Sequence, residues 1–355
     1  MRSLQMLFNE LKYFDYQFPE PQYLGAKYIH RSWINRYIPD GVNVALDAFG
    51  GSQSIAFLFK QKGIRTLTND FMDFNNQIGI ALIENKDQKL TEKDIDILFS
   101  PNPEPEKYNL IESLYADLFF NHADAKIIDA FRANVELLEN KYKKALAIAV
   151  MNRSMTRKVT MGHFAHTQAL AYAASPDRVK RNRSLVQPIK DIFMSLYQQY
   201  NDAVFDNDEE NKSFNNNTLE LIPKLEGVDL VYFDPPYCNS HADYQSFYHL
   251  LETFTEYWKD KKFVNGTRRY EPKRYSGFDK KATAICSIES MLKSSSDIPY
   301  WIISYNDRSY PDIQTFTSLI SRFKKDIRIE SRTYKYGRGG KGSVAGSKEI
   351  LLICK

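Results

Sequence analysis

The alternation of apolar and polar positions predicts a β-α-β unit near the start of the chain. The mostly apolar run VNVALDAF at residues 42–49 predicts a buried strand, and it ends in GGS. SIAFLFKQKG at 54–63 predicts a helix that Gly63 closes at its C-terminus. RTLTND at 65–70 predicts the next strand, which ends in an acidic residue. Two strands joined through a helix in this way indicate a parallel sheet.

The same strand pattern returns in the last third of the chain. We expect strands at 228–233, 299–306 and 349–355, with a helix at 313–323. The stretch between them is different, because segments such as KIIDAFRANVELLENKYKKALAIAVM have the spacing of helices. These patterns predict an α/β domain formed by residues 1–84 and 213–355, with a mainly helical insertion at 85–212.

The composition narrows the class of protein. Hydrophobic residues make up 43% of the 355 positions, and no apolar run approaches the roughly 20 residues that a membrane span needs. The three cysteines, Cys238, Cys286 and Cys354, form no CxxC pair, which argues against structural zinc or a disulfide framework and fits a cytoplasmic protein. His163 and His166 form no HxxxH motif, so we expect no metal.

Positive charge is concentrated in two stretches, although the net charge is only +4. Residues 151–190 hold eight Lys or Arg against the single Asp177, and residues 256–285 hold nine against four acidic residues. Aromatic, amide and hydroxyl side chains are interleaved with these charges. A solvated basic face would have the same charge, but this mixture favours a nucleic acid, whose phosphates bind such side chains.

Candidate chemistry lies where the predicted strands end. Gly50 and Gly51 would let a ligand approach the backbone, and the following helix would offer free amides. Gln53 stands where a third glycine is expected, so the dinucleotide fingerprint GxGxxG is absent. Asp70 ends the second strand, where an acid suits a ribose or an amine, although a plain turn or N-cap would also explain it.

The stretch VYFDPPYCNS at 231–240 ends a strand with a carboxylate and two prolines. An exocyclic amino group is a poor nucleophile because its lone pair is delocalised into the base. Asp234 and the fixed carbonyl of Pro235 can each accept one of its N–H bonds, which localises the lone pair and aims it at an electrophilic methyl. Tyr237 can stack on the base, a contact worth about 1–3 kcal/mol. We interpret DPPY as a clamp for an amino-bearing base.

With these residues in place, the chain resembles the adenine-specific DNA methyltransferases, in particular the DNA adenine methylase group. The resemblance runs through six segments in the order of that group: YLGAKYIHRSWINRYIP (23–39), DAFGGSQS (47–54), TND (68–70), NRSMTRKVTMGHF (152–164), DPPY with DYQSFYHLLE (243–252), and SYNDRS (304–309) with GSKEILLIC (346–354). It implies a Rossmann-like sheet with a helical DNA-recognition insertion. It also implies transfer of methyl from S-adenosylmethionine to N6 of an adenine flipped out of duplex DNA.

The resemblance assigns roles residue by residue. The implied cofactor contacts are Tyr23, Lys27 (near the cofactor's carboxylate), Phe49, Gly50, Gly51, Asp70, Asn217 and Asp234. The implied catalytic residues are Asp234, Pro235, Pro236 and Tyr237. The expected DNA contacts are Arg153, Arg157, Lys158, Arg181, Arg183, Arg268 and Arg269. Asn217 and Gln53 depart from the family pattern, which often has an acid and a glycine there, so weaker cofactor binding is expected.

Three alternatives stay open at the level of sequence. The same chemistry could act on the amino group of cytosine or on RNA, although DPPY in place of SPPY favours adenine by resemblance. A catalytically silent DNA-binding module could retain the fold.

The resemblance further implies a bacterial modification enzyme that protects DNA against a partner restriction endonuclease.

Overall fold

The computed structural model describes residues 13–160, 162–238, 243–334 and 347–355, so Met161, Asn239, Ser240 and Gly346 of the quoted segments lie outside it. Its centre is a seven-stranded sheet in the order β3-β2-β1-β4-β7-β9-β8. The strands are β1 (Val44–Asp47), β2 (Arg65–Asn69), β3 (Lys212–Phe214), β4 (Leu230–Phe233), β7 (Tyr300–Asn306), β8 (Ile327–Tyr334) and β9 (Ser347–Cys354). All neighbours pair in parallel except β9, which is antiparallel to both β7 and β8. The expected α/β fold is confirmed.

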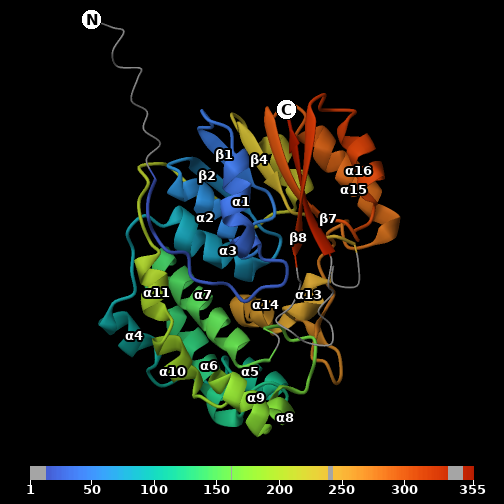
Figure 1. The fold of residues 1–355 in the computed structure, drawn as a ribbon. Helices are drawn as coiled ribbons and strands as arrows, with labels where there is room; N and C mark the ends of the chain where they lie inside the picture. Colours follow the sequence, from blue (N-terminus) through green and yellow to red (C-terminus); the bar gives the residue numbers. More distant parts are fainter. Residues whose placement is uncertain (1–12, 161, 239–242, 335–346) are drawn as a thin grey trace, which may run out of the picture.

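Helices cover both faces of the sheet and build a separate layer beside it (Figure 1). They are α1 (Arg31–Ile34), α2 (Ser54–Gln61), α3 (Asp73–Gly79), α4 (Glu92–Leu98), α5 (Leu110–Tyr115), α6 (His122–Val135), α7 (Lys141–Arg157), α8 (Ala169–Ala173), α9 (Pro176–Arg181), α10 (Ile189–Met194), α11 (Tyr197–Asp202), α12 (Thr218–Leu221), α13 (Tyr244–Phe247), α14 (His249–Glu256), α15 (Lys281–Ser294) and α16 (Ile313–Ile320). Short 3-10 turns lie at Lys27–His30 (η1), Asn35–Tyr37 (η2), Arg183–Leu185 (η4) and Ile222–Lys224 (η5), and a π turn at Ile80–Glu84 (η3).

The period-two pattern of the strands divides the core of the sheet into two halves. In β4, Val231 and Phe233 pack in the cluster that α15 and α16 cover, whereas Leu230 and Tyr232 pack in the cluster of α1 and α2. Successive strand residues point to opposite faces, so a strand buried on both faces must be apolar throughout. This explains why VDLVYF is an uninterrupted apolar run.

A third hydrophobic cluster holds the helical layer together. It joins α4 to α8, α10 and α11 with α3, which precedes the predicted insertion, and with α14, which follows it. The small hairpin of β5 (Lys262–Phe263) and β6 (Tyr270–Glu271) follows α14. We therefore retain 85–212 as the proposed insertion, with the addition that residues from both flanking segments complete its core.

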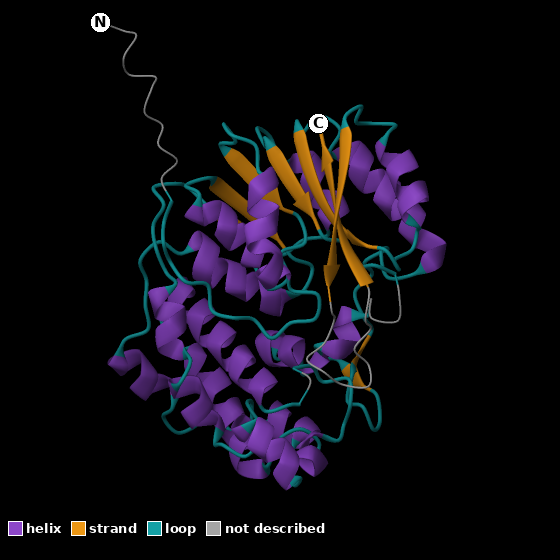
Figure 2. Ribbon diagram, viewed as in Figure 1, coloured by secondary structure: helices purple, strands orange, loops and turns teal. Residues whose placement is uncertain are grey.

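The carboxyl ends of the parallel strands face the helical layer (Figure 2). Ligands of open α/β sheets bind at this edge, and a pocket lies there, lined by residues that follow β1, β2 and β4. Among the helices of the described segments, none is long and apolar enough to cross a membrane. No group of three potential metal ligands occurs among the described residues.

Candidate active site

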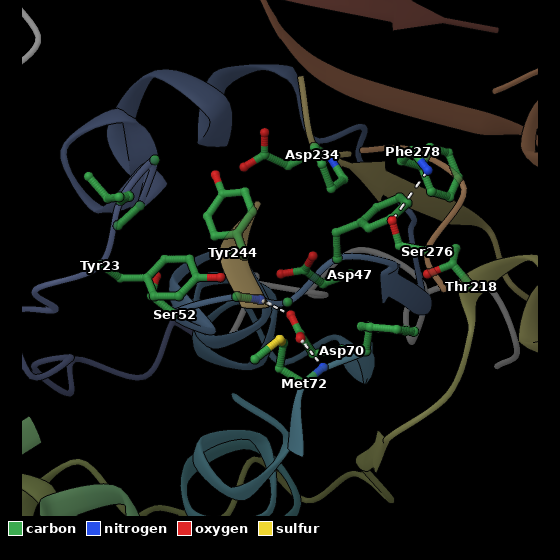
Figure 3. Close-up of a pocket in the computed structure, with 18 of the residues that line it drawn as sticks. Tyr23, Asp47, Ser52, Asp70, Met72, Thr218, Asp234, Tyr244, Ser276 and Phe278 are labelled. Carbon is green, nitrogen blue, oxygen red and sulfur yellow. Dashed lines mark hydrogen bonds between the residues drawn. The ribbon is translucent and has the colours of Figure 1, made fainter. Parts of the chain in front are cut away.

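Three acidic residues from three adjacent strands surround one pocket (Figure 3). Asp47 is the last residue of β1, Asp70 follows β2, and Asp234 follows β4. Because β2, β1 and β4 are parallel neighbours, their ends meet at one edge. The structure thereby brings together Asp70 and Asp234, which the sequence identified, with Asp47, which it did not.

The loop after β1 has a conformation that explains its unusual composition. Gly51 has a φ of +48°, and a Cβ there would lie 3.2 Å from the ring of Tyr23. Gln53 has a left-handed φ of 66° and is fully buried beneath the loop. Its Oε1 accepts a 2.6 Å hydrogen bond from the Thr68 hydroxyl, and a Cβ on Gly50 would lie only 2.4 Å from its Nε2. Gln53 therefore packs against the loop and supports it. Packing thus explains why a glutamine stands where the family pattern has a glycine.

Asp70 accepts hydrogen bonds from both the glycine-rich turn after β1 and its own turn after β2. Its Oδ2 accepts a 2.7 Å hydrogen bond from the Gly51 N–H, and its Oδ1 accepts one of 2.8 Å from the Met72 N–H. Burial raises the pKa of this carboxyl, and the two backbone donors oppose the rise. Together with the Asn75 side-chain amide, these donors leave part of the acceptor capacity of the carboxylate for a ligand.

Asp47 is the acidic residue that sequence reasoning missed. Its Oδ2 accepts a 3.1 Å hydrogen bond from the Ala56 N–H, whereas its buried Oδ1 has no hydrogen-bond partner within the described part of the chain. Burial, with the negative charge of Asp234, raises its pKa to about 8. The sequence did contain a signal for Asp47, because it is an acidic residue at the end of an apolar strand run. The same signal identified Asp70 and Asp234.

Asp234 accepts hydrogen bonds from two side chains that lie at the site. The Tyr237 hydroxyl donates a 2.5 Å hydrogen bond to Oδ1, and the Lys27 ammonium donates one of 2.8 Å to Oδ2. Burial raises the pKa of Asp234, and the positive charge of Lys27 opposes that rise. The sequence predicted Lys27 near a cofactor carboxylate, and the structure places its ammonium on Asp234, with Glu349 3.5 Å away. Pro236 lines the same pocket.

Aromatic side chains form the remaining walls. The Tyr23 ring stacks on Tyr244 and Tyr248, with centroids 5.6 Å and 4.8 Å apart. On another side, Phe49 meets Phe278 edge to face at 5.3 Å. Tyr23 and Phe49 were predicted to contact the cofactor. Tyr244 and Phe278 were not, because only the tertiary fold brings segments so distant in sequence to the pocket.

Asn217 also lines the pocket, close to where the family pattern has an acid. Its Oδ1 accepts a 3.1 Å hydrogen bond from the Leu219 N–H and so caps α12. An asparagine is a preferred residue at this position of a helix. The structure thus gives Asn217 a local role besides the predicted cofactor contact.

Two of the basic residues expected to contact DNA are engaged inside the protein. The Lys158 ammonium lies 2.8 Å from a carboxylate oxygen of Asp124, and both side chains are only 4% exposed. The Arg153 guanidinium donates to the Gln22 side chain at 2.7 Å and to the Glu20 carbonyl at 3.3 Å. The expectation for Lys158 is corrected: this buried ion pair joins α6 to the end of α7 and presents no ammonium to a phosphate.

The other basic residues differ in exposure. Arg181 and Arg183 are exposed at the end of α9 and in η4. Arg157, Arg268 and Arg269 are half-buried. The exposed pair therefore remains the best-placed part of the predicted DNA contact.

The sheet order, the single antiparallel strand and the acid-lined pocket at the strand ends define a Rossmann-like methyltransferase fold. The model of the D12 class N6 adenine-specific DNA methyltransferase family matches residues 23–319. The type II methyltransferase M2.HphI of Haemophilus parahaemolyticus is 30% identical over 343 residues, which cover 95% of this chain and 98% of that protein. The modification methylase StsI of Streptococcus sanguinis is 24% identical over 357 residues, covering 94% of this chain and 51% of that protein.

The chain belongs to the D12 class N6 adenine-specific DNA methyltransferases. This confirms the family that the six sequence segments indicated. It also decides between the alternatives, because the family acts on the N6 amino group of adenine in DNA and its members are enzymes. The alternatives of cytosine, RNA and a silent binding module are therefore not favoured.

Proposed function

We propose that the protein uses S-adenosylmethionine to methylate one adenine within a specific duplex DNA sequence, with Asp234 and Pro235 holding the flipped base. The observation that carries this proposal is the convergence of Asp47, Asp70 and Asp234 on one pocket, beside a glycine turn. Methyltransferases of this family generally depend on S-adenosylmethionine, so the pocket must accommodate both that cofactor and the target base.

The residues present fit the cofactor. The unpartnered buried oxygen of Asp47 is a ready acceptor for an ammonium or hydroxyl group. Gly51 lines the pocket without a side chain, next to the ring of Tyr23, so its backbone is open to close contact with a ligand. We propose that Asp70 binds the ribose hydroxyls, that Asn217 lies at the adenine end, and that Tyr23, Lys27, Phe49 and Gly50 complete the site.

The mechanism requires this chain to prepare a weak nucleophile. Asp234 and the Pro235 carbonyl each accept one N–H of the adenine amino group, which localises the lone pair on N6. Tyr237 stacks on the base, which costs a few kcal/mol to flip out of the duplex. When bound, S-adenosylmethionine would supply an electrophilic sulfonium methyl, and Asp234 and the Pro235 carbonyl would aim the N6 lone pair at it. Asp234 then accepts the surplus proton of the methylated N6 and passes it to solvent.

The biological setting follows from the names of the relatives. One is a type II methyltransferase and the other a modification methylase. We propose that this protein likewise modifies DNA in a bacterial cytoplasm, where the DNA lies, and protects it against a cognate restriction endonuclease. The nuclease would be a functional partner that recognises the same sequence.

The test is transfer of labelled methyl to unmethylated duplex DNA, followed by nucleoside analysis. We expect label in N6-methyladenine, and a loss of roughly 10²–10³-fold for Asp234→Ala, as for other preorganised electrostatic contacts. Asp297→Ala, an exposed acid before β7, is the matched control and should keep full activity. Label in cytosine, or an active Asp234→Ala enzyme, would contradict the proposal.

A further inference from the structure

The buried ammonium of Lys27 lies between two carboxylates. Its Nζ is 2.8 Å from Asp234 Oδ2 and 3.5 Å from Glu349 Oε1, and it also donates to the Gly25 carbonyl at 3.0 Å. The Lys27 side chain is 4% exposed and that of Glu349 only 1%. Two negative charges and one positive charge are thus enclosed together, directly beside the residue to which we assign catalysis.

Glu349 reaches this place through the one antiparallel strand of the sheet. It lies on β9, paired with Asn306 at the end of β7, and β7 in turn pairs with β4, which leads to Asp234. The following residues of β9, Ile350 to Leu352, are buried and apolar. An isolated ionised carboxylate in such surroundings is strongly disfavoured, and the nearby ammonium of Lys27 contributes to stabilising it.

The contacts of Asp234 conflict with the role proposed for it. Tyr237 occupies Oδ1 and the Lys27 ammonium occupies Oδ2. A charge-assisted hydrogen bond from lysine is stronger than a neutral one from an amino group of a base. An adenine N–H would have to share Oδ2 with the Lys27 ammonium, so it is held more strongly when Lys27 moves away from that oxygen.

We propose that Glu349 is a positioning residue that takes the Lys27 ammonium when the target adenine engages Asp234. This inference rests on the proposed function. Because Lys27 already lies between the two carboxylates, a small rotation of its side chain exchanges one ion pair for the other. Without the charge of Glu349, the ammonium would stay on Asp234 and compete with the base.

The test is a double-mutant cycle of Glu349→Gln and Lys27→Met, read as the single-turnover rate of methyl transfer at saturating DNA. We expect Glu349→Gln to lower this rate at least tenfold while the KM for S-adenosylmethionine changes less than threefold. In the Lys27→Met background the same substitution should change the rate less than twofold, because no ammonium remains to be held. Glu330→Gln, on the neighbouring strand β8, is the control and should match the wild type.

Two results would overturn the inference: a wild-type rate for Glu349→Gln, or an equal loss on both backgrounds, which would mean that Glu349 acts independently of Lys27. If Glu349→Gln does not fold, Glu349→Asp takes its place in the cycle: its shorter carboxylate lies farther from the ammonium and should lower the rate with Lys27 present but not in the Lys27→Met background. Failure of the proposed function looks different, because the wild type itself would then place no label on adenine; Glu349 would have no such role either.

Discussion

At the scale of single residues, the site repeats one feature: an acidic residue at the end of a buried strand. The sequence identified Asp70 and Asp234 from this feature together with the motifs around them. Asp47 has the same position in β1, and one of its buried oxygens has no hydrogen-bond partner in the described chain, which leaves that polar group available to a ligand. Sites of this kind commonly sacrifice stability for function.

Asp47→Asn should therefore make the protein more stable and less active. The carboxyl has its folded pKa raised to about 8 by burial and by the charges of Asp234 and Asp70. In the unfolded chain it ionises near its ordinary value, so folding binds a proton and wild-type stability falls as the pH rises toward about 8. The variant lacks this loss, and its advantage in Tm should grow between pH 5 and pH 8.

Thermal unfolding across this pH range, with cofactor binding measured in parallel, checks the prediction. Asp40→Asn replaces an exposed carboxyl and should leave the pH dependence unchanged. A Tm advantage of Asp47→Asn that shrinks with rising pH would show that the carboxyl is not held neutral by its surroundings.

At the scale of elements, the strands and helices with strong periodicity were predictable and the short or edge elements were not. β3 has three residues within a polar run, and only its pairing with β2 makes it a strand. β8 is an edge strand whose charged residues hide its apolar alternation. The location of α14 was also decided by packing, since its apolar face completes the helical core next to α3.

The contact between α14 and α3 depends on Glu252. Its two carboxylate oxygens accept hydrogen bonds of 3.0 Å from the Asp73 and Phe74 N–H groups at the start of α3. Glu252→Ala would leave two buried donors unpaired, at about 1–3 kcal/mol each. We expect a loss of stability of that order and weaker cofactor binding, because α3 follows the pocket wall at Asp70.

Chemical denaturation with a cofactor titration measures both effects. Glu256→Ala is the matched control on the same helix, because its ion pair with Arg274 is partly exposed and such pairs contribute about 0–1 kcal/mol. Equal losses for the two variants would contradict the capping role of Glu252.

At the scale of the whole molecule, the catalytic edge of the sheet faces the helical layer (Figure 1). The basic stretch 151–190 belongs to that layer, but its charges are not equivalent. Lys158 is buried against Asp124, whereas Arg181 and Arg183 are exposed. A charge count along the sequence cannot make this distinction, because it depends on which side of each helix is packed.

DNA binding should separate the two kinds of residue. Replacing Arg181 and Arg183 with Ala should weaken binding at all sequences and reduce the slope of log K against log salt by about 2, without a change in Tm. Lys158→Ala should instead lower stability by about 3–5 kcal/mol, because it leaves Asp124 buried without its partner. A salt titration of DNA affinity together with thermal unfolding distinguishes these results, and an unchanged slope for the double Arg variant would count against this surface.

The sequence by itself determined the α/β class, the strands at β1, β2, β4, β7 and β9, the family, and two of the three acids of the pocket. It could do so because buried parallel strands must be apolar on both faces and because a ligand site at their ends requires polar residues there. Only the tertiary structure decided which charges meet. Lys27 and Glu349 are more than 300 positions apart, and the antiparallel strand β9 brings them together beside Asp234. Periodicity describes which face of an element is buried, whereas the pairing of strands decides what that face touches.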